Sequence, residues 1–159
     1  MYKENSTPFV IELKSTEETA ELAQKLSSIL QEGDLLLFTG EIGTGKTTFI
    51  KALAKGLGIK ETVTSPTFVI HAIRESGRIP LSHVDLYRLD SDEEVENIGF
   101  EEYYDTAVTV VEWADRYSGF QEPFLDLYFQ YGEGENDRTL SIGANGGDWD
   151  SRLKAILPE

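Results

Sequence analysis

The sequence predicts a three-layer α/β fold in which a mixed, mostly parallel sheet lies between helices. Two observations predict it. Apolar runs that suit buried parallel strands alternate with segments of helical spacing along the first sixty residues. The later chain adds two pairs of alternating segments around turns, which predict antiparallel hairpins. With 159 residues, the chain has the length of a single domain.

The first half of the chain predicts two strand–helix units. Residues 9–13 form the first strand, and Ser15 with the acids after it caps a helix that Gly33 ends. Residues 35–39 form the second, fully buried strand, and a second helix runs over 48–57 to a pair of glycines. The opening therefore reads strand, helix, strand, helix.

The second half predicts five strands and two short helices. The strands are residues 67–73, 81–86, 108–112, 125–131 and 138–142. Segments 67–73 and 81–86 pair around Gly77, and the last two strands form a closing hairpin. One helix begins at Ser91 and runs to Ile98 before Gly99. The other begins at about 148 and covers Trp149 to Leu157.

Composition excludes several classes of protein. The chain has 14 Lys and Arg against 29 Asp and Glu, a net charge of −15, which disfavours an autonomous grip on nucleic acid. It has no Cys, so disulfide frameworks and thiolate chemistry are excluded. No apolar run approaches the ~20 residues that span a bilayer, and the N-terminal residues lack a signal-peptide core. We therefore expect a cytoplasmic protein with no membrane role.

A phosphate-binding loop follows the second strand. Its residues fit the pattern G-x-x-x-x-G-K-[ST] at every fixed position: Gly40, Glu41, Ile42, Gly43, Thr44, Gly45, Lys46 and Thr47. Glycines let backbone N–H groups converge on phosphate oxygens at a helix N-terminus. We expect Lys46 to reach the outer phosphates, Thr47 to offer its hydroxyl to Mg²⁺, and Thr44 and Thr48 to line the cradle. The chain is thus predicted to be a P-loop NTPase.

Two carboxylates stand at the ends of apolar runs, where ligands bind in open α/β sheets. Glu112 follows Val108, Thr109, Val110 and Val111 and ranks first as a magnesium ligand. Asp85 could orient the attacking water or hold a metal-bound water. For each acid the alternative is a solvated charge at a strand end.

Three further features are ambiguous from residue type alone. Thr64, Ser65, Pro66 and Thr67 form a hydroxyl-rich turn that is either a switch sensing the γ-phosphate or a plain surface turn. His71 and His83 have no second ligand at metal spacing, so both are interpreted as structural or peripheral. Trp113 packs against the loop region or a partner.

Four motifs together resemble the TsaE family, also called YjeE, over roughly residues 10 to 142. They lie at residues 40–49, 64–68, 83–89 and 111–113. The resemblance implies an ATPase required for threonylcarbamoyladenosine modification of tRNA at adenosine 37. It implies that Lys46 and the loop hold ATP, Thr47 and Glu112 coordinate Mg²⁺, Asp85 assists hydrolysis, and residues 64–67 form the first switch.

The resemblance also implies partners and two more contacts. ATP hydrolysis would reset a complex of TsaD and TsaB, in which TsaD transfers the threonylcarbamoyl group. Contact with tRNA would be indirect, through that complex. Thr16 and Arg138 would lie near the base or sugar of the nucleotide.

Rival functions stay open at this point. A small-molecule kinase shares the loop and the size, although the arginines of this chain form no close pair of the kind found in lids. A nucleotide-binding adaptor without significant turnover is a second rival. A GTPase is disfavoured, because no Asn-Lys-x-Asp or Thr-Lys-x-Asp segment is present to read guanine.

Overall fold

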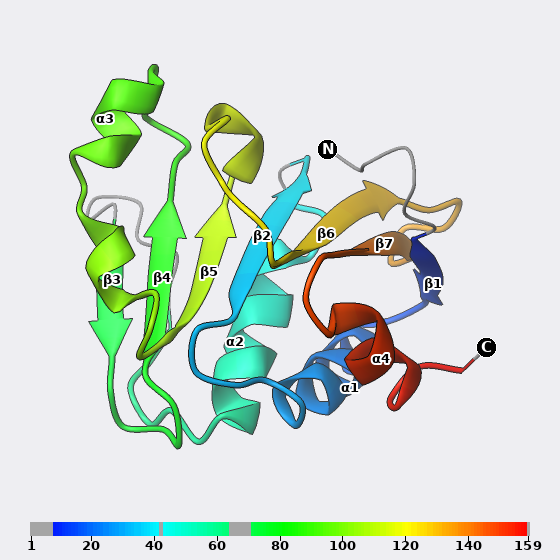
Figure 1. Cartoon of the computed structure of the whole chain (residues 1–159). Helices are drawn as coiled ribbons and strands as arrows, with labels where there is room; N and C mark the ends of the chain where they lie inside the picture. Colours follow the sequence, from blue (N-terminus) through cyan, green and yellow to red (C-terminus); the bar gives the residue numbers. More distant parts are fainter. Residues whose placement is uncertain (1–7, 42, 64–70, 159) are drawn as a thin grey trace.

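The strands form one sheet in the computed structural model, which describes residues 8–41, 43–63 and 71–158. Across the described residues the strand order is β1-β7-β6-β2-β5-β4-β3 (Figure 1). The strands are β1 (Phe9–Leu13), β2 (Leu35–Gly40), β3 (His71–Arg74), β4 (Leu81–Asp85), β5 (Val108–Glu112), β6 (Phe124–Tyr131) and β7 (Arg138–Asn145). The expected α/β class is confirmed.

The strand directions are mostly parallel, as predicted. Parallel pairings join β6, β2, β5 and β4 at the centre of the sheet. β7 runs antiparallel to β6, and β1 runs antiparallel to β7, so β1 has the direction of the central four. The predicted hairpins are both present, with β3 antiparallel to β4 at the far edge. Residues 67–70 of the predicted strand lie outside the described residues.

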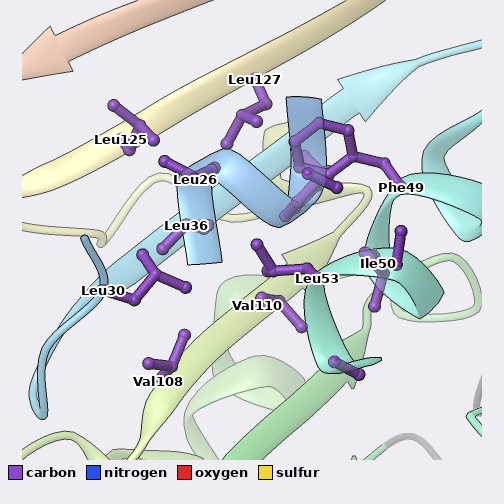
Figure 2. Packing of buried hydrophobic residues seen from close by; sticks show 14 of the residues in the cluster. Leu26, Leu30, Leu36, Phe49, Ile50, Leu53, Val108, Val110, Leu125 and Leu127 are labelled. Carbon is purple, nitrogen blue, oxygen red and sulfur yellow. The ribbon is translucent and has the colours of Figure 1, made fainter. Parts of the chain in front are cut away.

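Helices and short turns cover the two faces of the sheet. The helices are α1 (Thr16–Ser27), α2 (Lys46–Gly56), α3 (Asp92–Glu96) and α4 (Trp149–Lys154), with 3₁₀ turns η1 (Phe100–Tyr103) and η2 (Ala114–Arg116). The larger core lies between the sheet and α1, α2 and α4. Figure 2 shows Leu26 of α1 and Phe49 of α2 among strand residues of this core, such as Leu127. A second core under α3, η1 and η2 lies on the opposite face.

Three helices end earlier than the sequence predicts. α1 ends at Ser27 and not at Gly33, α3 ends at Glu96 and not at Ile98, and α4 ends at Lys154 and not at Leu157. In each case the chain continues as tighter turns with bonds to the third residue back, such as Ile98 to Val95 and Ile156 to Leu153. α2 differs at its start, because it begins at Lys46, two residues before the expected position.

The capping predictions hold. Ser15 accepts a hydrogen bond from the backbone N–H of Glu18 at 3.1 Å, and Ser91 accepts one from Glu94 at 3.2 Å. Within the described ranges, we find no helix whose length and apolar character would let it cross a membrane.

Candidate nucleotide site

The glycine loop joins the central strand β2 to α2, as the sequence predicts. Gly40, Gly43 and Gly45 all have positive φ angles, of 129°, 81° and 101°. A Cβ atom on Gly40 would overlap the backbone carbonyl of Phe129 on the neighbouring strand β6. Only glycine combines this conformation with such a close approach. The loop is therefore fixed against the sheet at its first residue.

Lys46 lies folded into this loop as the first residue of α2. Its Nζ donates hydrogen bonds to the carbonyl oxygens of Gly40 and Glu41, the latter at 3.3 Å. The ammonium also lies 4.3 Å from the centroid of the Trp113 ring. Burial lowers the pKa of Lys46, while the charge of Glu112 acts most strongly in the opposite direction. Lys46 is thus a cation that lies among the charges of Glu112, Asp115 and Asp85.

The two predicted carboxylates lie side by side. Asp85 and Glu112 are register partners at the carboxyl ends of the parallel strands β4 and β5, and both are buried. Asp85 Oδ1 accepts a hydrogen bond from the Tyr87 backbone N–H at 2.9 Å. Glu112 Oε2 lies 2.7 Å from Nε2 of His83. The ring of His83, which the sequence predicts to be structural or peripheral, thus contacts a predicted site residue.

Several of the residues described above line a cavity of about 500 Å³. Its lining includes both predicted carboxylates, Lys46 and Trp113. It also reaches Thr16 at the start of α1 and Arg138 at the start of β7, which only the family resemblance had connected with a nucleotide. The lining residues are Ser15, Thr16, Thr19, Gly43, Gly45, Lys46, Thr47, Thr48, Asp85, Tyr87, Glu112, Trp113, Asn136 and Arg138.

Some predicted residues do not line this cavity or are not described. Thr44 is buried within the loop, where its hydroxyl donates to the Glu41 carbonyl at 2.6 Å. Ile42 and the predicted switch, Thr64, Ser65, Pro66 and Thr67, lie outside the described residues.

Several residues in the walls of the cavity were not predicted from the sequence. Ser15 was predicted as a helix cap only, and Thr19 and Asn136 carry no local signal of a site. Tyr87 offered a signal, since it follows Asp85 by two residues in the motif at 83–89. Its ring lies 4.9 Å from that of Trp113, with the Arg116 guanidinium 5.3 Å from the Tyr87 centroid. Trp113 is the one non-glycine residue of the described chain with positive φ, at 58°.

The oxygen groups of the cavity fit a magnesium–nucleotide complex. Mg²⁺ prefers oxygen ligands and is commonly held by one or two carboxylates together with phosphates and waters. Thr47, Asp85 and Glu112 supply a hydroxyl and two carboxylates to one cavity. Within the described ranges there is no cluster of three or more His, Cys, Asp or Glu that could hold a metal on its own.

A glycine cradle between a central parallel strand and a helix, with carboxylates at the ends of the next two strands of the sheet, defines the P-loop class of α/β proteins. Within that class, the family model described as "Threonylcarbamoyl adenosine biosynthesis protein TsaE" matches residues 13–140. The chain belongs to this TsaE family. The family resemblance expected from four short motifs is confirmed.

Individual relatives agree with the family match. The tRNA threonylcarbamoyladenosine biosynthesis protein TsaE of Treponema pallidum is 43% identical over 104 residues, covering 65% of this chain and 76% of the relative. The protein of the same name from Nostoc sp. is 35% identical over 135 residues, or 82% of each chain. The crystal structure of Bacillus subtilis YdiB has a TM-score of 0.80 and 26% identity, covering 97% of both chains.

Proposed function

We propose that this protein is an ATPase required for threonylcarbamoyladenosine modification of tRNA at adenosine 37, and that it hydrolyses ATP to reset the TsaD–TsaB complex. One observation carries the enzymatic part: Lys46, Thr47, Asp85 and Glu112 line the same cavity. Membership in the TsaE family supports the pathway. The proposed role places the protein in the cytoplasm, where it would meet tRNA only through the complex.

The loop residues bind and orient the triphosphate. Backbone N–H groups at the start of α2 point toward the N-terminal end of the helix, where the helix dipole favours negative charge. Lys46 exchanges its carbonyl partners, Gly40 and Glu41, for outer phosphate oxygens, which are better acceptors because they are charged. The ammonium then stabilises the charge that develops as the γ-phosphoryl group is transferred.

The two carboxylates divide the remaining work. Thr47 and Glu112 would hold Mg²⁺, which, when bound, neutralises charge on the phosphate oxygens. Asp85 orients the attacking water or a metal-bound water at the adjacent strand end. Its Oδ1 bond to the Tyr87 backbone fixes the carboxylate for either task. Thr16 and Arg138 would contact the base or sugar from the far wall of the cavity.

The net charge supports a division of labour with partner proteins. A chain with a net charge of −15 gains little binding free energy from tRNA phosphates. A partner with basic surfaces could bind this protein at one place and the tRNA at another. ATP hydrolysis at this site would then act on the partner's conformational cycle and not on the tRNA itself.

Phosphate release from MgATP tests the proposal. The purified chain is assayed alone and then with the TsaD–TsaB pair from the same organism, with Lys46→Ala as the blank. We expect slow release alone and strong stimulation by the pair. Bound ATP without any stimulation would favour the adaptor, and phosphate transfer to a metabolite in place of free phosphate would favour a kinase.

A further inference from the structure

His83 is a polar ring buried in the sheet, between a core residue and a cavity residue of the same strand. On β4, the side chains of Leu81, His83 and Asp85 point to one face of the sheet, because successive residues of a strand alternate. Leu81 belongs to the core under α2, and Asp85 lines the cavity. His83 lies between them with a relative exposure of 1%. Burial of an imidazole is unfavourable unless it makes a hydrogen bond.

The hydrogen bond that His83 makes is to Glu112. His83 pairs in register with Val110, and Glu112 lies two residues further along β5 on the same face. The ring therefore reaches diagonally across the two strands, and Nε2 lies 2.7 Å from Oε2. Both side chains are at least 96% buried, with exposures of 1% and 4%, so water does not compete for this bond.

The chemistry of the two groups gives the bond a direction. An ionised carboxylate can only accept, so His83 donates its Nε2–H to Glu112. His83 Nδ1 is buried and has no hydrogen-bond partner among the described residues. Nε2 is therefore the ring atom through which His83 bonds to another side chain.

We propose that His83 is a positioning residue for Glu112, which it holds in the orientation that a magnesium–nucleotide complex requires. The inference rests on the proposed function, in which Glu112 is a ligand of Mg²⁺. Hydrogen-bond partners of metal ligands commonly change metal affinity by about 10- to 100-fold when they are removed. In this proposal His83 fixes the orientation of the Glu112 carboxylate and contacts neither the nucleotide nor the metal.

Three variants separate positioning from packing. His83→Phe keeps a planar ring and removes the donor, whereas His83→Gln restores an N–H donor. The matched control is His71→Gln, because His71 also bonds a neighbour, the Ser82 hydroxyl at 2.8 Å. Ser82 alternates with His83 on β4, so this pair lies on the opposite face of the sheet.

The first measurement is the affinity for a non-hydrolysable ATP analogue by calorimetry, with and without Mg²⁺. Mg²⁺ should raise the affinity of the parent for the analogue, and we expect this increase to be about 10- to 100-fold smaller in His83→Phe. The affinity of His83→Phe for the analogue without Mg²⁺ should equal that of the parent. His83→Gln should recover most of the gain, and His71→Gln should match the parent. A folded His83→Phe variant with the full Mg²⁺ gain would overturn the proposal.

The second measurement needs no metal or turnover. The ¹⁵N shifts of the imidazole in the parent protein should show a proton on Nε2 of His83, and a ring that carries its proton on Nδ1 alone would overturn the proposal. This spectrum and the Gln variant decide the question if the Phe variant does not fold. If Mg²⁺ leaves the affinity of the parent unchanged, the proposed magnesium site is wrong and the role of His83 with it, whatever tautomer is seen.

Discussion

Asp126 carries a pH-dependent cost of folding that one substitution should remove. It lies on β6 with a relative exposure of 0%, and its Oδ2 accepts a hydrogen bond from Asn145 Nδ2 at 2.9 Å. Its Oδ1 and the Oδ1 of Asn145 have no partner among the described residues. Burial raises the pKa of Asp126 to about 7, although the Asn145 bond acts in the opposite direction. The perturbation is Asp126→Asn, which cannot ionise.

The size of the cost follows from this pKa. In the unfolded chain the pKa of Asp126 has its ordinary value of 3.8. Between that value and about 7, the folded state keeps a proton that the unfolded state releases, so the free energy of unfolding falls as pH rises. At ~1.36 kcal/mol per pH unit, the whole interval corresponds to about 4 kcal/mol. The cost is absent below the interval and complete above it.

Urea unfolding at pH 5 and pH 8 measures this effect. About 3 kcal/mol of the cost falls between these two conditions. The difference in unfolding free energy between variant and parent should therefore shift by about 3 kcal/mol in favour of Asp126→Asn, because the other acids titrate in both proteins. Asp150→Asn, at an exposed position, is the control and should shift by less than about 0.5 kcal/mol. Identical pH dependence of parent and Asp126→Asn would refute the reasoning.

Three further substitutions test the loop and an ion pair at the opposite end of β2. Lys46→Ala should abolish tight ATP binding in a titration with a fluorescent analogue. The reason is that charge-assisted hydrogen bonds contribute ~1.5–3 kcal/mol. An affinity within about twofold of the parent would contradict the role assigned to Lys46. Gly40→Ala should lower the thermal midpoint well beyond Gly99→Ala, because both have positive φ but only Gly40 has a strand carbonyl in the way. Arg152→Ala should lower the free energy of unfolding by about 3 kcal/mol in chemical denaturation. The reason is that Arg152 bonds the Asp34 carboxylate at 2.8 and 2.9 Å, and Asp34 stays buried when this partner is removed. A loss below about 1 kcal/mol would argue against that ion pair.

The part of the site that local sequence encodes could be predicted. Gly40 to Thr47 form one continuous segment, and spacing alone identifies the cradle. Glu112 and Asp85 each follow an apolar run, and parallel strands bring their carboxyl ends to the same edge. No pairing between distant strands had to be known for these assignments.

Contacts that depend on strand register could not be predicted. His83 meets Glu112 only because β4 and β5 pair with one particular alignment across 29 residues of sequence. Arg138 donates to the Gly43 carbonyl at 3.3 Å because β7 returns beside β6, far from the loop in sequence. The end of α1 escaped prediction because hydroxyls satisfy its last carbonyls, with Ser27 Oγ donating to Gln24 at 2.6 Å.

The cavity takes its walls from widely separated parts of the chain, with Thr16 near one end and Arg138 near the other. Both reach it only when β1, β7 and β6 have joined the central strands. A ligand held between these walls therefore binds only a sheet in which β1, β7 and β6 are already in place. Such a ligand at about 100 times its Kd adds ~2.7 kcal/mol to the unfolding free energy. Saturation with nucleotide would then protect the most distant segments of the molecule together, including from proteases that attack a transiently opened edge.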